Sequence, residues 1–182
     1  MKAIILLFAS LFALSAHGAV NDLDMFGLKG AVDSICIIMD DAGLEWQTEF
    51  TFDEDGMLIE IDGSEVECTR DKQGRISSIT VEDAVEDNED EFTTIEMKLT
   101  YDSAGRVIKV TATSQGESWV QNYRYDSRGL LKEHDYDGAD QDEAQKYEYL
   151  EFDAHGNWTL RHEKLESMDQ TIVQKRNITY RN

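Results

Sequence analysis

Proline is absent from this chain of 182 residues, and basic residues are scarce beside acidic ones. Proline has no backbone N–H, and most N–H groups of paired strands donate to a neighbouring strand. The absence of proline therefore fits a chain made mainly of paired strands. Seventeen Lys and Arg face 38 Asp and Glu, giving a formal charge of −21. Such a chain repels nucleic acid and anionic membrane surfaces, so we expect neither as a partner.

The best-known catalytic motifs are also missing. The chain contains no Gly-x-Ser-x-Gly, no Gly-rich phosphate loop and no His-Glu-x-x-His. His134 and His162 fall in expected strands and His155 at a turn tip, which favours structural or solvent-facing roles. Carboxylate pairs, as used in glycoside hydrolysis, are too common among 38 acids to mark a site.

The first residues predict a secretory signal peptide. Lys2 precedes the apolar run Ala3–Leu14, and small residues follow, with Gly18 as the expected last residue before cleavage. The run is shorter than the roughly 20 residues that a membrane-spanning helix needs. We therefore expect residues 1–18 to be removed and 19–182 to form a single secreted or periplasmic domain, without membrane insertion. No Cys follows the cleavage region, which argues against a lipid anchor.

Six Asp-x-x-Gly tetrads stand between runs of strand-forming residues. Asp at the first position of a type I turn accepts bonds from the backbone, and Gly at the fourth supplies the positive φ of a bulge. Each tetrad therefore predicts a hairpin. The six pairs are Asp40 and Gly43, Asp53 and Gly56, Asp71 and Gly74, Asp102 and Gly105, Asp126 and Gly129, and Asp153 and Gly156.

The fold class expected from these turns is all-β, an antiparallel meander of about a dozen strands in a curled or partly closed sheet. Ile95, Met97 and Leu99 alternate with polar residues, as in a strand with one dry side. Only 24–29 and 137–146 have room for a short helical turn. The expected strands are 29–39, 44–52, 57–62, 65–70, 75–82, 92–101, 106–113, 118–125, 130–136, 144–152, 157–165 and 171–180.

Turn geometry also predicts the register. In a bulged hairpin of this kind, the residue before Asp lies opposite the second residue after Gly, and such cross-strand pairs stabilise a sheet. The Asp40 copy offers Met39 and Glu45 and breaks the pattern, which suits a terminal unit at a sheet edge. The expected pairs are Phe52 with Leu58, Arg70 with Ile76, Tyr101 with Val107, Tyr125 with Leu131, and Phe152 with Trp158.

These units resemble the YD repeats of bacterial secreted and cell-surface proteins. The likeness is carried by Tyr101-Asp102-Ser103-Ala104-Gly105, Tyr125-Asp126-Ser127-Arg128-Gly129 and Phe152-Asp153-Ala154-His155-Gly156. The opening Gly27-Leu28-Lys29-Gly30 looks like the start of small secreted members. The resemblance spans most of residues 26–180 and implies tandem hairpins. The shared motif describes a hairpin turn, so the resemblance implies no catalytic or ligand-binding residues.

Cys36 and Cys68 both lie in expected strands and travel to a compartment that favours disulfides. A bridge between them and two buried free thiols both fit the sequence. They make no zinc site, because no further Cys or His has the supporting spacing.

The sequence offers candidate residues for two kinds of ligand site, one for sugars and one for calcium. Aromatic side chains that share an exposed face can stack on sugar rings, and the alternative is packing within the sheet. The candidates for this aromatic platform are Trp119, Tyr123, Tyr136 and Tyr147. Acidic residues crowded in a loop can gather calcium, with Asp135, Asp137 and Asp140 as candidates, or simply stay solvated. Apart from calcium, no cofactor is expected.

The function expected from the sequence is a non-catalytic binding or scaffold module whose partner is a carbohydrate or an envelope protein. A hydrolase that acts on carbohydrate through paired carboxylates is the first alternative. The second is a structural protein that self-associates through free edge strands near 29–39 or 171–180.

Overall fold

The computed structural model describes residues 21–85, 88–138, 141–165 and 169–181, and these residues are all-β, as expected. They form one short 3₁₀ turn, η1, and thirteen strands. The elements are η1 (Asp22–Asp24), β1 (Val32–Asp41), β2 (Leu44–Phe52), β3 (Leu58–Ile61), β4 (Ser64–Glu65), β5 (Glu67–Arg70), β6 (Ile76–Val85), β7 (Asn88–Tyr101), β8 (Val107–Ser114), β9 (Glu117–Tyr125), β10 (Leu131–Gly138), β11 (Gln141–Phe152), β12 (Trp158–Leu165) and β13 (Gln170–Tyr180).

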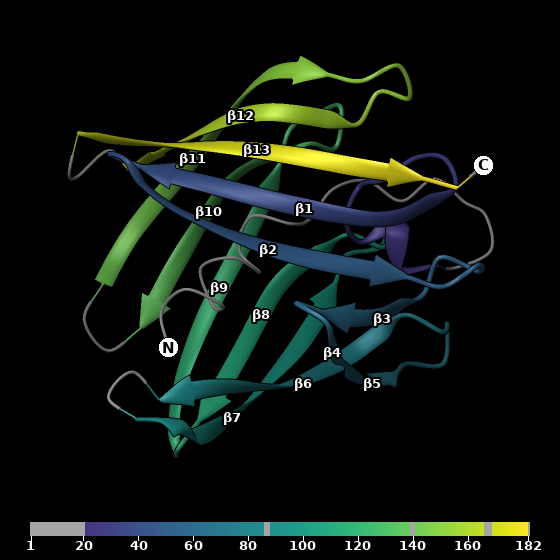
Figure 1. The fold of residues 1–182 in the computed structure, drawn as a ribbon. Helices are drawn as coiled ribbons and strands as arrows, with labels where there is room; N and C mark the ends of the chain where they lie inside the picture. Colours follow the sequence, from purple (N-terminus) through teal and green to yellow (C-terminus); the bar gives the residue numbers. More distant parts are fainter. Residues whose placement is uncertain (1–20, 86–87, 139–140, 166–168, 182) are drawn as a thin grey trace.

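All thirteen strands belong to one antiparallel sheet that is nearly closed on itself. Neighbours in the chain are neighbours in the sheet, except that β4 and β5 do not pair and that the first and last strands, β1 and β13, do. The sheet is therefore barrel-like, with β1, β2, β12 and β13 across the front in Figure 1 and β7 to β10 behind them.

Pairing of β1 with β13 corrects one expectation. Ile35 lies opposite Ile178 in this pair, so the strands near 29–39 and 171–180 are not free edges. The edges of the sheet are β4 and β5 instead. The sequence could not reveal this pairing, because it joins strands almost a whole chain apart.

Five of the six Asp-x-x-Gly tetrads form the same bulged turn. In the Asp126 copy, Gly129 N donates to Asp126 O at 2.9 Å and Asp126 N to Leu130 O at 2.8 Å. The Asp126 carboxylate accepts from the backbone N–H groups of Arg128 and Leu130, each at 2.9 Å. The same bonds recur at Asp53, Asp71, Asp102 and Asp153.

The Asp40 copy is a different turn. Ala42 and Gly43 have φ of 51° and 91° between the paired residues Asp41 and Leu44, which is a two-residue hairpin. Asp40 keeps one bond, from Gly43 N at 2.9 Å. The unit breaks the register pattern because its turn type differs, and the expectation that it lies at a sheet edge is wrong.

The predicted register is confirmed. Each expected pair occurs, and each stands beside an irregularity in the ladder, as a bulge requires. The pairs are Phe52 with Leu58, Arg70 with Ile76, Tyr101 with Val107, Tyr125 with Leu131, and Phe152 with Trp158.

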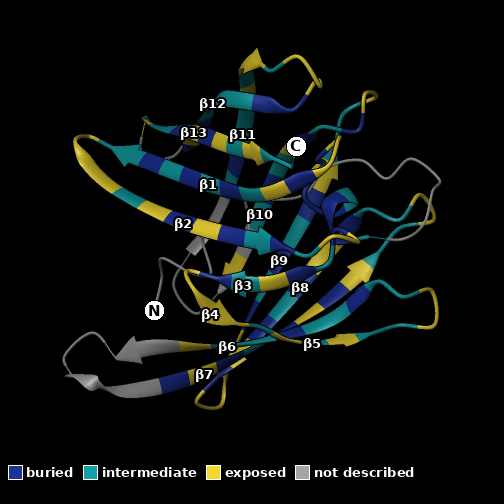
Figure 2. Cartoon of the chain, turned by 45° about the vertical axis from the view of Figure 1, so that its right-hand side comes forward, coloured by how far each residue is buried: buried dark blue, intermediate teal, exposed yellow. Residues whose placement is uncertain are grey.

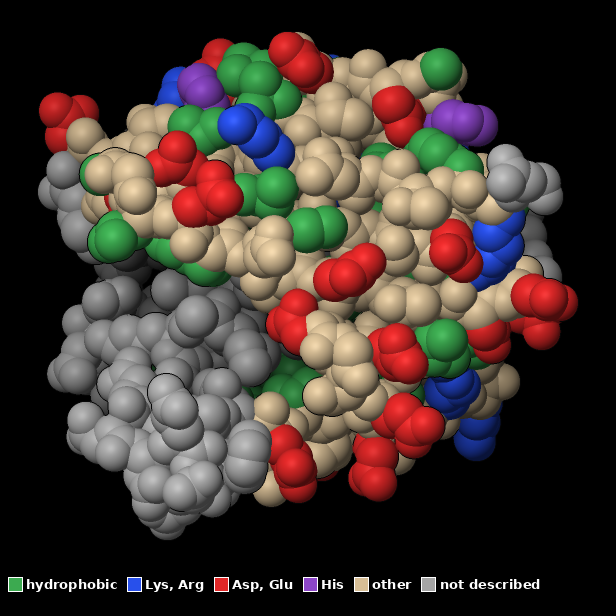
Figure 3. Space-filling model, in the orientation of Figure 1, with side chains coloured by type: hydrophobic (Ala, Val, Ile, Leu, Met, Phe, Trp, Pro, Cys, Tyr) green, Lys and Arg blue, Asp and Glu red, His purple; other side chains and the backbone are tan. Residues whose placement is uncertain are grey.

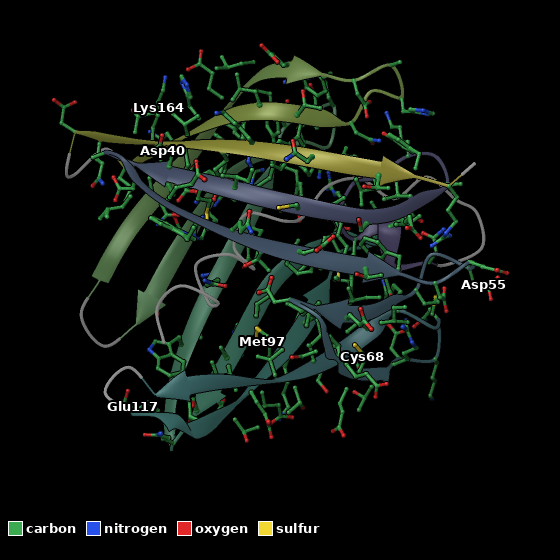
Figure 4. All side chains as sticks on the ribbon, viewed as in Figure 1. Asp40, Asp55, Cys68, Met97, Glu117 and Lys164 are labelled. Carbon is green, nitrogen blue, oxygen red and sulfur yellow. The ribbon has the colours of Figure 1, made fainter. Side chains whose placement is uncertain are left out.

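The bulged turns lie together at one end of the rolled sheet. Figure 4 places Asp55, from one such turn, at this end, and Asp40 and Glu117, beside two-residue hairpins, at the other. The segment that carries η1 packs into the end with the bulged turns. Phe26 is fully buried there, 5.2 Å from the ring centroids of both Phe50 and Phe52.

Of the two segments with room for a helical turn, the first, 24–29, shares only Asp24 with η1, which lies mainly before it. The second is strand where the structure describes it, in β10 and β11. No helix among the described residues is long and apolar enough to cross a bilayer.

The interior is divided between an apolar and a polar part. Buried residues alternate with exposed ones along the strands (Figure 2). Strands β1, β2 and β6 to β8 send mainly apolar side chains inward, such as Ile35, Phe50, Ile79 and Val110. Strands β9 to β13 add buried polar side chains, namely Gln121, His134, Gln145, Arg161, Glu163, Gln174 and Arg176.

Candidate functional site

A stack of three rings lies at the centre of the polar part. Tyr123 on β9, His134 on β10 and Tyr147 on β11 project inward from adjacent strands. Their ring centroids are 5.7 Å and 6.1 Å apart, with interplanar angles of 17° and 23°. His134 is fully buried. The interior cluster is the name we give to these three residues together with six buried residues of β11 to β13, namely Gln145, Trp158, Arg161, Glu163, Gln174 and Arg176.

Hydrogen bonds connect the stack to the charged residues. His134 Nδ1 lies 3.0 Å from the Tyr147 hydroxyl, which in turn bonds the Glu163 carboxylate. Gln174 bridges two charges, since its amide nitrogen donates to Glu163 and its oxygen accepts from Arg161 Nε at 2.7 Å. The cluster is therefore a continuous chain from a neutral ring to a guanidinium.

Two buried arginines share one indole ring. The guanidinium carbons of Arg161 and Arg176 lie 4.1 Å and 4.0 Å from the Trp158 ring centroid. Arg176 also donates to Trp158 O at 3.0 Å and to Phe26 O at 3.1 Å. Cation–π contacts and carbonyl bonds replace part of the water that these cations lose.

Burial shifts the pKa values of the cluster strongly. It raises the pKa of Glu163 to about 7, although Arg161, Tyr147 and Gln174 act in the opposite direction. It lowers the pKa of His134 to about 3 and that of Arg176 to about 9. At neutral pH His134 is uncharged and both arginines are cations, so the cluster carries more positive than negative charge.

The outer surface has the opposite sign. Figure 3 shows acidic side chains scattered over the face in view, with fewer Lys and Arg among them. The formal charge of the whole chain is −21. The buried guanidinium groups therefore lie inside a protein whose net charge is strongly negative.

Some buried polar atoms have no hydrogen-bond partner. Among the described residues these are Trp46 Nε1, His134 Nε2, Gln145 Oε1 and Arg176 Nη2. Buried polar groups are nearly always paired, so each of these atoms calls for an explanation such as a bound molecule. His134 and Gln145 lie opposite each other in the register of β10 and β11, which makes their inward side chains neighbours.

A groove of about 610 Å³ lies beside the arginine pair. Its walls come from β11, β12 and β13, and Arg176 is one of its lining residues. It lies where the pairing of β12 with β13 ends, beyond Leu160 and Lys175. Arg176 thus belongs both to the groove and to the arginine pair at Trp158.

The expected aromatic platform does not form an exposed face. Trp119 and Tyr123 are buried, at 8% and 3% exposure, and Tyr147 stacks on His134 inside the sheet. The side chain of Tyr136 lies outside the described residues. Two of the four candidates, Tyr123 and Tyr147, do meet, but in the interior cluster.

The expected calcium ligands do not gather where the structure describes them. Asp135 pairs with Arg124, Asp137 is exposed on the same strand, and Asp140 lies outside the described residues. No group of three or more metal-binding side chains occurs in the part of the chain that the structure describes.

The cysteines are free thiols, as in the second of the two arrangements the sequence allowed, but both are half-buried and not buried. Cys36 is on β1, where its thiol bonds Gln47, whereas Cys68 is on the edge strand β5 (Figure 4). Three strands separate β1 from the β4–β5 gap, so the two residues are not neighbours across the sheet. Burial raises the pKa of Cys68 to about 11, which makes its thiol a poor nucleophile.

Sequence reasoning missed Gln145, Arg161, Glu163 and Gln174. A usable signal was present in β13, where Gln174 and Arg176 stand in phase with Ile172 and Ile178. A polar side chain in phase with apolar ones on a strand points to the buried face. The comparisons with known proteins add no relative, since no family model and no curated protein matches this chain.

Proposed function

We propose that this chain is an exported, non-catalytic binding module that holds a small ligand against the interior cluster. One observation carries the proposal: two buried polar atoms, His134 Nε2 and Gln145 Oε1, lie on facing residues and lack any hydrogen-bond partner. A bound molecule would satisfy both, where an empty interior would leave their desolvation uncompensated.

The distribution of buried carboxylates supports binding over hydrolysis. Among the described residues, only Asp22 and Glu163 are buried acids. Asp22 belongs to η1 and pairs with Arg70, while Glu163 belongs to the interior cluster. A glycosidase needs two carboxyl groups flanking one bond, and these two serve different elements.

Export is inferred from the leader-like first 18 residues, which lie outside the described part of the chain. Expression of the full chain in a bacterium, followed by fractionation and intact mass measurement, tests it. We expect the extracytoplasmic fraction to contain a chain that begins at Ala19. A cytoplasmic chain that retains Met1 would contradict export.

The test of binding is native mass spectrometry after incubation of the mature chain with a small-molecule extract of cell envelope. We expect a bound species of defined mass, together with a rise in melting temperature. Tyr147→Phe removes the hydroxyl that links His134 to Glu163 and should weaken the complex. Tyr101→Phe removes a hydroxyl that bonds Ile76 O on β6, away from the interior cluster, and should leave the complex intact. If no extract component binds, the proposal fails.

We also infer that the chain is a small YD-repeat protein. The support is the set of backbone bonds that five tetrads share and the tyrosines that precede two of them. This inference concerns only the hairpin scaffold and says nothing about the ligand.

A further inference from the structure

The protonation of His134 follows from its neighbours. When Glu163 is ionised, the single hydrogen of the Tyr147 hydroxyl points to that carboxylate. The 3.0 Å bond between Tyr147 and His134 Nδ1 must then be donated by the ring. Because burial keeps the ring neutral, it carries only one hydrogen, on Nδ1. With Glu163 ionised, His134 Nε2 is therefore a lone-pair acceptor.

Gln145 Oε1 is an acceptor as well, so the two unpartnered atoms cannot bond each other. His134 is 0% exposed and Gln145 is 5% exposed, and cross-strand neighbours have Cβ atoms about 5 Å apart. The facing pair thus presents two lone pairs at one place and supplies no donor between them. A molecule that fits must bring two donors of its own.

Charge narrows the chemical class of that molecule. An anion would bring further acceptors to a place that already has two. A cation would bring donors, but it would have to give up its water in a buried place beside the cation Arg161, a cost that is high for any buried charge without a dedicated partner. Neutral hydroxyl groups meet neither obstacle, because they donate hydrogen bonds and carry no charge.

We propose that the interior cluster binds a neutral polyhydroxylated ligand, a sugar or polyol, through two hydroxyls that donate to His134 Nε2 and Gln145 Oε1. This inference rests on the proposed binding function and specifies its ligand class. It moves the carbohydrate hypothesis from an exposed aromatic face to a buried pair of acceptors.

The experiment uses the mature chain, residues 19–182, and three sets of ligands matched in size. One set holds neutral mono- and disaccharides and polyols, the second sugar acids, and the third amino sugars. Binding is measured by isothermal titration and by the shift in melting temperature. We expect saturable binding of at least one neutral compound and at least tenfold weaker binding of its acidic and amino analogues.

Two variants connect binding to the acceptors. Gln145→Met keeps the length of the side chain and removes the acceptor, so affinity should fall at least tenfold. His134→Phe keeps a flat ring in the stack, removes Nε2 and should act likewise. The matched control is Gln47→Met on the exposed face of β2, which should bind as the parent does. Should His134→Phe fail to fold, Gln145→Met decides alone.

Each result has a defined meaning. Equal or tighter binding of the charged analogues, or unchanged affinity in Gln145→Met, overturns the ligand class and leaves the binding function standing. Absence of binding in all three sets overturns the ligand class, and absence of binding in the envelope extract as well overturns both proposals.

Discussion

At the scale of single residues, Gln174 connects two opposite charges in the interior, those of Arg161 and Glu163. Its amide has an acceptor end and a donor end, and the structure uses the first for Arg161 and the second for Glu163. A buried amide whose two ends are both satisfied has only one orientation, and this in turn fixes both charged side chains. The cost of burying Glu163 nevertheless remains visible in its raised pKa.

Stability should therefore fall with pH because of Glu163. Its folded pKa of about 7 lies above the ordinary value of 4.5, so protonated Glu163 favours the folded state. The contribution is complete below pH 4.5 and is lost as pH rises through 7, on the order of 3 kcal/mol in total. Denaturant unfolding of the parent and Glu163→Gln at pH 5 to 8 measures it, and the parent should lose more stability than the variant.

The control for this prediction is Glu148→Gln. Glu148 is exposed, and its ion pair with Lys164 holds its pKa below the ordinary value, so it loses nothing as pH rises through 7. A difference between parent and Glu163→Gln that stays constant from pH 5 to 8 would contradict the assignment.

At the scale of elements, tyrosine hydroxyls link each hairpin to the one before it. Tyr101 donates to Ile76 O at 2.6 Å, Tyr125 to Val107 O at 2.5 Å and Tyr149 to Leu131 O at 3.0 Å. Each acceptor is the second residue after the glycine of the preceding turn. Tyr101 and Tyr125, which precede the Asp of their tetrads, thus pair within their own hairpin through the backbone and bond the previous hairpin through the hydroxyl. In the third case Phe152 precedes the Asp, and Tyr149, three residues earlier, supplies the hydroxyl.

Loss of one such hydroxyl should destabilise the protein locally. Tyr125→Phe keeps the ring against Leu131 and leaves Val107 O without its side-chain donor. We expect a cost of about 1–2 kcal/mol, as for a buried hydrogen bond. Equilibrium unfolding gives the magnitude, and hydrogen exchange should show faster opening around β8 and β9. Unchanged stability would mean that the hydroxyl bond is dispensable.

The glycines of the bulged turns should differ in their response to alanine. At Gly74, with φ of 84°, a Cβ would meet nothing within 4 Å, so only backbone strain of about 1–2 kcal/mol applies. At Gly56, with φ of 78°, the Cβ would lie 2.9 Å from Leu23 Cδ1, in the packed segment at η1. In thermal unfolding, Gly56→Ala should have a lower melting temperature than Gly74→Ala. Equal losses of stability in the two variants would show that the segment at η1 moves aside without a cost in free energy.

At the scale of the whole molecule, the sequence predicts the hairpins well and the closure poorly. Turn type and register depend on residues within one tetrad and its flanks, as for Asp102 and the pair Tyr101 with Val107. The closure depends on β1 meeting β13, and no local pattern encodes a partner so distant. The interior cluster joins five strands, β9 to β13, that are consecutive neighbours in the sheet, and it was missed because a polar residue on a strand ordinarily indicates the solvent face.

The gap between β4 and β5 is the weak point of the closed sheet, and the N-terminal segment holds it together at one end. Asp22 is 2% exposed, accepts from Leu58 N on β3 at 2.8 Å, and pairs with Arg70 on β5 through bonds of 2.9 Å and 2.8 Å. One carboxylate therefore bridges the strands on both sides of the gap. This also explains why a buried charge is retained at η1.

Removal of this carboxylate should open the gap before the rest of the sheet unfolds. Asp22→Ala leaves Arg70 without its counter-ion and should cost about 3 kcal/mol, whereas Asp33→Ala, from the exposed pair with Arg181, should cost less than about 1 kcal/mol. In hydrogen exchange, amides of β3 and β5 should exchange faster in Asp22→Ala, while those of β10 to β12 stay protected. Uniform acceleration over all strands would instead mean that the sheet opens as one unit and that the gap has no separate stability.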